Sequence, residues 1–211
     1  MMTKEALKNI LLKSDITRRT SLSQVRQILA SAGLPREKCQ VADGASKMCI
    51  IPREADFVIK WSTGYDCESG FDEAYDEVVI YQRAIKAGLE MFFPRTEVFC
   101  TYNGINFIIQ EKVDFSTCTS PASKENRYTH KTRTVSPTII EKMDNCFYHM
   151  RRGRELNPLW ASMAIILYGK RRCKALCRFI IENNINDLHG SNIGYLKDKP
   201  IILDFSGYHR D

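Results

Sequence analysis

Three polar residues near the C-terminal end have types and spacing that suit metal and phosphate chemistry. Asp187 and Asn192 are five residues apart, and Asp204 directly follows the apolar run 201–203. A carboxylate at the end of a buried strand and an amide oxygen are ligands that Mg²⁺ accepts, with waters and phosphate oxygens at its other positions. A second carboxylate, that of Asp187, has the chemistry to orient and deprotonate an attacking hydroxyl. Together these residues predict phosphoryl transfer, which needs metal, an oriented nucleophile and positive charge around the phosphates.

The same residues resemble two motifs of the protein-kinase-like superfamily. Asp187-x4-Asn192 is similar to the catalytic loop of that family, and Asp204-Phe-Ser-Gly207 is similar to its D-F-G segment. The Asp-Leu-His-x-x-Asn form is closer to the small-molecule and bacterial branch, such as aminoglycoside and choline kinases, than to eukaryotic protein kinases. The resemblance implies that Asp187 is the catalytic base, Asn192 a metal ligand and Asp204 the principal metal ligand, with ATP and Mg²⁺ as cofactors.

The resemblance covers roughly residues 40–211 and supplies a phosphate-binding lysine upstream. Val58-Ile-Lys60 ends a predicted strand and is similar to the V-A-I-K motif of the family. It implies that Lys60 binds the α- and β-phosphates. A carboxylate on the following helix is then expected to position Lys60. Glu77 fits this role best, and Glu73, one turn away on the same face, is the alternative.

Two further segments take their expected roles from the same resemblance. The segment 110–113 corresponds to the hinge, where the backbone of Glu111 and Val113 would meet adenine. The turn 43–47 corresponds to the loop that covers the phosphates, with contacts from Gly44 and Ser46.

The sequence also departs from the family pattern. Gly44 is the one glycine of the turn 43–47, where the family has several, and Ile185-Asn186 replaces the usual His-Arg before the catalytic aspartate. Seven residues follow Asp204, without the activation segment that holds a peptide substrate in protein kinases. We therefore expect a small hydroxyl-bearing acceptor, a partner protein that completes the site, or nucleotide binding without transfer.

Hydrophobic spacing and turn residues predict the elements that must position these side chains. Helical spacing occurs in 3–14, and Ser21 with Gln24 predicts a capping box for a second helix that ends before Gly33 and Pro35. Short apolar runs in 40–61 predict two or three strands, and a helix is expected over 71–87. Asn103-Gly104 predicts a hairpin of strands 95–102 and 105–113. The later part predicts a linker over 115–137, helices near 138–151 and 158–183, and a short hairpin around the turn 197–200.

Strands that come before helices indicate an α+β chain. The resemblance implies the two-lobed protein-kinase-like fold. We expect a helical N-terminal extension over 1–38, an N-terminal lobe of antiparallel sheet plus helix over 39–113, and a minimal helical C-terminal lobe over 114–211.

Composition points to a cytoplasmic location. The chain has 211 residues, and no signal peptide or membrane-spanning apolar run is evident. Its eight cysteines show no zinc-binding spacing, so we expect free thiols rather than a disulfide framework.

Charge is unevenly distributed along the sequence. Residues 124–178 hold thirteen Lys or Arg against four Asp or Glu. Such a basic stretch is either a solvated surface or a site for phosphate, nucleic acid or an acidic partner. The sequence therefore leaves three hypotheses. They are an Mg-ATP phosphotransferase, a pseudokinase that binds nucleotide as a regulatory module, and a basic nucleic-acid-associated protein.

Overall fold

The computed structural model describes residues 3–44, 46–63, 72–113, 158–185 and 192–206. Contacts between residues divide the chain into two compact units, each formed by two stretches of sequence. Unit 1 comprises Met1–Val79 and Arg95–Lys112, and unit 2 comprises Ile80–Pro94 and Val113–Asp211. Each unit has a large hydrophobic cluster of its own, so the two are described in turn.

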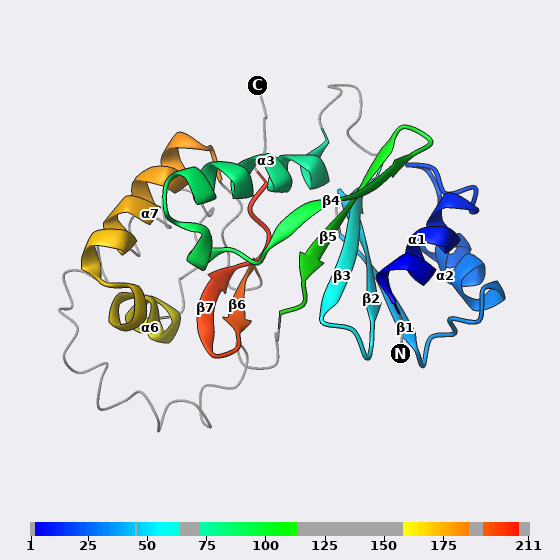
Figure 1. Ribbon diagram of the computed structural model, residues 1–211, viewed down its shortest axis with the longest axis horizontal. Coiled ribbons are helices and arrows are strands. Elements are labelled where there is room, and N and C mark those ends of the chain that lie inside the picture. The colour runs from blue at the N-terminus through cyan, green and yellow to red at the C-terminus, as the bar shows by residue number, and fades with distance from the viewer. Residues whose placement is uncertain (1–2, 45, 64–71, 114–157, 186–191, 207–211) are drawn as a thin grey trace. The chain divides into compact units, whose positions relative to one another are not determined.

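Unit 1 is built on a five-stranded antiparallel sheet with the strand order β1-β2-β3-β5-β4 (Figure 1). The strands are β1 (Cys39–Asp43), β2 (Lys47–Pro52), β3 (Phe57–Ser62), β4 (Thr96–Tyr102) and β5 (Ile105–Glu111). Strands β4 and β5 form the predicted hairpin, and its turn residues Asn103 and Gly104 have φ angles of 50° and 70°. A two-residue hairpin turn of type I′ requires positive φ at both positions, which is why Asn-Gly is favoured there.

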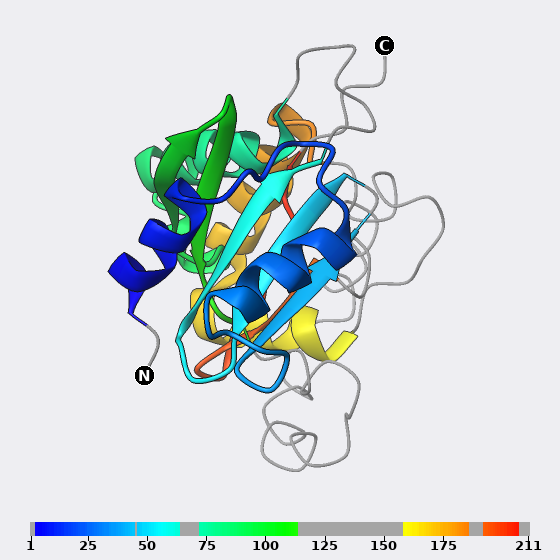
Figure 2. The same cartoon turned by 90° about the vertical axis from the view of Figure 1, so that its right-hand side faces the viewer.

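Two helices, α1 (Lys4–Leu12) and α2 (Leu22–Ser31), cover one face of this sheet (Figure 2). Their buried leucines and valine pack against alternate residues of the strands, which include Ile50, Ile59, Trp61, Phe107 and Ile109. The predicted capping box of α2 is confirmed. Its Ser21 hydroxyl accepts a hydrogen bond from the Gln24 backbone N–H, and the Gln24 side chain accepts one from the Ser21 N–H. The segment predicted as an extension thus belongs to the same compact unit as the sheet.

The opposite face of the sheet is covered by the first half of α3 (Glu73–Lys86). Ala74 and Val78 of this helix pack against Ile108 of β5. Because side chains alternate along a strand, Ile108 points away from the α1 and α2 face to which its neighbours Phe107 and Ile109 belong. Residues 73–79 of the helix belong to unit 1, and residues 80–86 belong to unit 2.

Unit 2 contains α6 (Pro158–Tyr168), α7 (Lys170–Glu182) and the short 3-10 helix η2 (Glu90–Phe92), with a hairpin of β6 (Ile193–Leu196) and β7 (Lys199–Ile202) (Figure 1). Its core joins aromatic and aliphatic side chains from these elements, among them Phe92, Trp160, Leu176, Phe179 and Phe205. The helix expected over 158–183 is divided at Gly169, whose φ of 83° is incompatible with a continuous right-handed helix.

Hydrogen bonds from α6 fix β7 in this unit. The Trp160 indole N–H donates to the Ile201 carbonyl at 3.2 Å, and the Tyr168 hydroxyl donates to the Pro200 carbonyl at 3.2 Å. The β6–β7 turn places Lys197 and Asp198 at φ angles of 50° and 66°. The predicted short hairpin is therefore present, and these two hydrogen bonds hold it to α6.

The described residues confirm the α+β class, with a five-stranded antiparallel sheet, a two-stranded antiparallel sheet and several helices. The contact-based units differ from the three predicted segments, because residues 1–38 join the sheet and residues 80–94 join the later helices. The predicted linker over 115–137 and the helix near 138–151 lie outside the described residues.

The core of each unit contains a buried cysteine, and this burial predicts how slowly its thiol is alkylated. Burial raises the pKa of the Cys39 thiol to about 11 and that of the Cys173 thiol to about 12. Because the thiolate is the reactive form, we expect both thiols to resist iodoacetamide at pH 8 in the folded protein and to react in urea. Cys177, which is half-buried on the same helix as Cys173, is the reference and should react faster. Peptide mass spectrometry measures all three.

The direction of the pKa shifts also gives a pH dependence. The folded state retains these thiol protons above the ordinary pKa of 9.0, so the free energy of unfolding should fall as pH rises from about 9 toward 12. In the alkylation experiment, rapid labelling of Cys173 in the folded protein at pH 8 would contradict its burial in the core of unit 2.

Candidate functional site

Lys60 lies on the central strand of the sheet in unit 1. Strand β3 sends Ile59 and Trp61 into the core beneath α1 and α2, so Lys60 projects from the opposite face. Its neighbours across the sheet are Cys49 on β2 and Ile108 on β5. Lys60 is therefore on the face that the first half of α3 covers.

The carboxylate of Glu77 is the centre of the polar contacts on this face. Glu77 has no exposed surface, and its two oxygens accept hydrogen bonds from two lysines. Lys60 Nζ lies 3.2 Å from Oε2, and Lys47 Nζ lies 2.9 Å from Oε1. Gln110 Nε2 donates to Oε2 at 2.9 Å. We call these four residues, Lys47, Lys60, Glu77 and Gln110, the Glu77 cluster.

Gln110 connects the cluster to the edge of the sheet. Its side-chain amide also donates to the Thr96 hydroxyl at 3.0 Å, and Thr96 is directly opposite Gln110 in the β4–β5 ladder. Both residues are buried. The amide therefore has two acceptors in the interior, as a buried polar group requires.

A second carboxylate of α3, Glu73, lies one turn before Glu77 and contacts the β1–β2 turn. The Ser46 hydroxyl donates a hydrogen bond to Glu73 Oε2, and Lys47 Nζ lies 4.0 Å from the same oxygen. Of the two carboxylates weighed for Lys60, the structure pairs Glu77 with it. Glu73 instead holds Ser46 and the start of β2.

Hydrogen bonds at the N-terminus of α3 set its position over the sheet. Asp72 Oδ1 accepts from the Tyr75 backbone N–H at 3.1 Å and from the Ser62 hydroxyl at 2.6 Å, in the manner of a helix N-cap. Asp72 Oδ2 accepts from Asn106 Nδ2 at 3.0 Å. Since Ser62 and Asn106 belong to β3 and β5, these bonds hold the first turn of α3 on the strands and place Glu77 against Lys60.

The Glu77 cluster holds two lysine ammonium groups in fixed positions. Two ammonium groups are fixed against one wholly buried carboxylate, and their side chains are 11% and 14% exposed. A buried carboxylate is tolerated when it is paired and fully hydrogen-bonded. Such a lysine is held in one position by the carboxylate, and a positioned ammonium group can bind phosphate oxygens.

The predicted metal ligands lie at the open end of the β6–β7 hairpin in unit 2. Asn192 precedes β6, and its backbone carbonyl accepts a hydrogen bond from the Leu203 N–H at 2.8 Å. Asp204 is the next residue after Leu203, so Asn192 and Asp204 occupy neighbouring positions of the two chain segments. The Ser206 hydroxyl lies 3.4 Å from Asp204 Oδ1, and Phe205 is buried against Phe93.

The donor set suits a hard cation with few protein ligands. An amide oxygen and a carboxylate are ligand types that Mg²⁺ takes, alongside waters and phosphate. Within the described ranges, no group of three or more His, Cys, Asp or Glu side chains is placed to hold a metal ion. Asn192 and Asp204 thus bring one amide and one carboxylate to neighbouring positions of the two described segments.

The other predicted site residues have the following places. The Gly44 N–H donates to the Lys47 carbonyl at 2.8 Å within the β1–β2 turn. Glu111 is at the end of β5, where its backbone N–H donates to the Arg95 carbonyl and its carboxylate accepts from the Arg95 N–H. Val113 is buried with Ile201 and Leu203 in unit 2. Asp187 lies outside the described residues.

The predicted hinge coincides with a boundary between the two units. Unit 1 ends at Lys112, and unit 2 resumes at Val113. The Lys112 ammonium donates to the carbonyls of Pro52 and Arg53, which ties the last residue of unit 1 to the β2–β3 turn.

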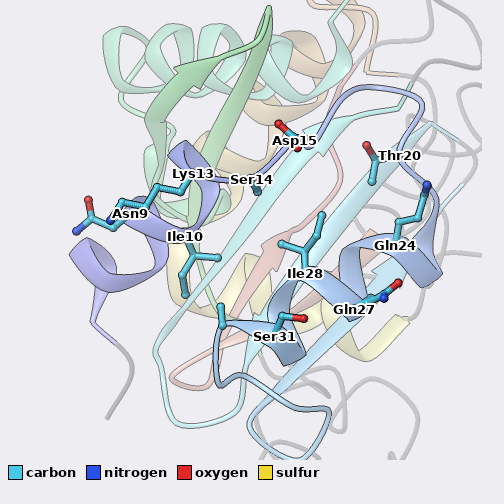
Figure 3. A pocket seen from close by; sticks show the side chains of 11 residues that line it. Asn9, Ile10, Lys13, Ser14, Asp15, Thr20, Gln24, Gln27, Ile28 and Ser31 are labelled. Carbon is cyan, nitrogen blue, oxygen red and sulfur yellow. The ribbon is translucent and has the colours of Figure 1, made fainter.

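A groove in the described part of unit 1 lies away from these residues. It has a volume of about 700 Å³ and runs between α1 and α2 (Figure 3). Most of the residues that line it are polar, with Asn9, Lys13, Gln24 and Gln27 among the labelled side chains. Because α1 and α2 pack on the face opposite Lys60, this groove contains none of the Glu77 cluster.

Comparison with known proteins gives no assignment: no protein-family model matches the chain, and no curated protein matches it. The lengths and apolar character of the described helices also bear on membrane insertion. None of the described helices has both the length and the apolar character needed to cross a bilayer.

Sequence reasoning missed two members of the Glu77 cluster. Lys47 was expected only as part of the loop that covers the phosphates, and Gln110 only as part of the hinge. The signal was strand alternation combined with register: β2 pairs Cys49 with Lys60, so Lys47, two residues away, shares the same face. That register was not evident from the sequence.

The burial of Glu77 predicts a large effect on stability. Glu77→Ala removes the acceptor of two lysines and Gln110, so it should lower the free energy of unfolding by about 3 kcal/mol. Urea denaturation followed by circular dichroism measures this change. The matched control is Glu97→Ala, because Glu97 forms an ion pair with Arg95 at the surface. The Arg95 side chain is 66% exposed and the Glu97 side chain is 46% exposed. Such a surface pair contributes about 1 kcal/mol or less. Equal effects of the two substitutions would contradict the central role of Glu77.

Proposed function

We propose that this chain is an ATP- and Mg²⁺-dependent phosphotransferase of the protein-kinase-like type, acting on a hydroxyl acceptor. The observation that supports the proposal is the ion pair of Lys60 and Glu77. It joins the central strand of an antiparallel sheet to the helix that covers that sheet. The resemblance implied this pairing, and the two residues are seventeen positions apart in sequence.

The residues of unit 1 have the role of binding phosphate. Lys60 contacts the α- and β-phosphates through its ammonium group, and Glu77 positions that group by a hydrogen bond and charge. Because Lys60 is fixed before nucleotide arrives, little ordering of its side chain is needed on binding. Gly44 and Ser46 belong to the turn that covers the phosphates, and Glu111 and Val113 contact adenine through their backbone.

The residues of unit 2 have the role of holding magnesium and orienting the acceptor. Asn192 and Asp204 hold Mg²⁺, which when bound neutralises charge on the phosphate oxygens. The oxygen of the acceptor hydroxyl forms a bond to the γ-phosphorus, and the Asp187 carboxylate accepts the proton that this hydroxyl loses. The bond between that phosphorus and the bridging oxygen breaks, and ADP leaves with the electron pair.

A second candidate is a nucleotide-binding regulatory module that transfers no phosphate, as in a pseudokinase. The observation that favours it is the engagement of the β1–β2 turn. The Ser46 hydroxyl is bound to Glu73 and the Lys47 ammonium to Glu77, so two polar groups of the expected phosphate loop already have protein partners. Under this hypothesis nucleotide stabilises the fold, and no product forms.

The two candidates make different predictions for Asp204→Ala. The phosphotransferase forms ADP from Mg-ATP, by self-phosphorylation or transfer to water, and the substitution should reduce this rate at least about 100-fold. ADP release by a coupled assay is the measurement. Glu182→Ala is the control, because it removes an exposed carboxylate in the same unit. Unchanged turnover in Asp204→Ala would refute the metal assignment.

Thermal shift with ATP, with and without Mg²⁺, separates the remaining outcomes. Stabilisation of the wild type without turnover would support the regulatory module. Absence of any nucleotide stabilisation would contradict both candidates.

A further inference from the structure

The outer face of α7 has a charge pattern opposite to the one that stabilises a helix. Five cations occupy its thirteen residues, four of them within the first five positions, and the sole acidic residue, Glu182, is the last. The N-terminal end of a helix dipole is positive and its C-terminal end is negative. Cations at the start and an anion at the end are therefore both unfavourable to the helix.

The described residues form no ion pair with these charges. The cations are Lys170, Arg171, Arg172, Lys174 and Arg178, and all five are exposed. The N-cap residue, Gly169, provides no side-chain hydrogen bond. The helix is held instead by its opposite face, where Cys173, Leu176, Phe179 and Ile180 are buried.

Three of the cations form a line along the helix. Lys170, Lys174 and Arg178 are spaced by four residues, so they lie on one side with a rise of about 6 Å between successive positions. Like charges at this spacing repel one another and lower helix stability. Glu182 follows Arg178 by four residues and is the one acidic side chain of this row. A row of three successive cations suits a partner with a regular series of negative charges.

We propose that the basic face of α7 binds the phosphate backbone of double-stranded DNA. Charge complementarity is the basis of this assignment, since a duplex presents a dense, regular array of phosphates. The exposed face holds no aromatic side chain on which single-stranded bases stack. The helix also contains no Ser, Thr, Asn or Gln, so it has no neutral polar group for base edges or for the 2′-hydroxyls of RNA.

Other acidic surfaces fit this face less well. A helix that lies on a membrane inserts its apolar face into the bilayer. The apolar face of α7 is already buried in the core of unit 2, so it is not free to insert. The proposal concerns α7 alone and does not depend on the phosphotransferase proposal.

Salt dependence of binding tests the proposal directly. The full-length protein is titrated into a fluorescent 20-base-pair DNA duplex between 50 and 200 mM NaCl, and binding is followed by fluorescence anisotropy. Four or five phosphate contacts predict a slope of about −4 for log K against log salt. A variant with Lys170→Gln, Lys174→Gln and Arg178→Gln should reduce the magnitude of the slope by about 2.7 and weaken binding at least about tenfold.

A matched variant separates a local effect from a change in net charge. Lys13→Gln, Arg36→Gln and Lys38→Gln remove three exposed cations of unit 1 and should leave the affinity and slope near those of the wild type. A charge-conserving variant with Lys170→Arg, Lys174→Arg and Arg178→Lys should also retain the slope. The charge-conserving variant keeps the proposal testable if the α7 glutamine variant does not fold.

Several results would overturn the proposal. They are absence of DNA binding at 50 mM salt, an equal loss of binding in both glutamine variants, and loss of the slope in the charge-conserving variant. Tighter binding to anionic vesicles, to single-stranded DNA or to an RNA duplex would show that the face has a different partner.

Discussion

Burial of the Glu77 carboxylate is the constraint on which the polar face of the sheet depends. A charged group with no exposure must be paired and hydrogen-bonded, because desolvation of an isolated charge is strongly unfavourable. Lys47, Lys60 and Gln110 satisfy this requirement from strands β2, β3 and β5. One carboxylate from a helix thereby connects three strands, and it fixes both the helix and the lysines. The hydrophobic contact of Ala74 and Val78 with Ile108 stabilises the same helix but does not specify where a lysine ammonium lies.

Local features of the fold were predictable because they depend on neighbouring residues. The capping box of Ser21 and Gln24 and the turn at Asn103-Gly104 follow from side-chain chemistry and backbone preference within a few positions. The pairing of Lys60 with Glu77 was also expected, although from the resemblance to a family and not from spacing. Its function as a phosphate-binding pair stays a prediction.

Other features depend on register and tertiary packing, which the sequence does not specify locally. The place of Lys47 beside Glu77 follows from the alignment of β2 with β3, and a shift of one residue would turn it to the other face. The packing of α1 and α2 on the sheet required knowledge of which apolar stripe meets which strand face. The division of the helix at Gly169 depends on a positive φ, which an isolated glycine in an apolar pattern does not demand.

The chain thus has two features that are less favourable to stability than simple alternatives. A buried ion-pair cluster is seldom more stable than well-packed apolar residues, and the charges of α7 oppose the helix dipole. Natural sequences accept such features where function uses them, because most positions are under pressure only to keep the fold above a stability threshold. We therefore interpret the Glu77 cluster as a site for phosphate and the α7 face as a site for a polyanion.

Acylation of lysines by an ATP acyl phosphate tests the central claim, that Lys60 binds nucleotide phosphate, most directly. The reagent transfers its acyl group to a lysine amine held close to the bound phosphates, and peptide mass spectrometry identifies the modified residue. The account predicts that Lys60 is acylated and that excess Mg-ATP prevents the reaction, while exposed Lys86 reacts slowly and without protection. Lys60 left unmodified, or modified equally with and without excess Mg-ATP, would contradict it.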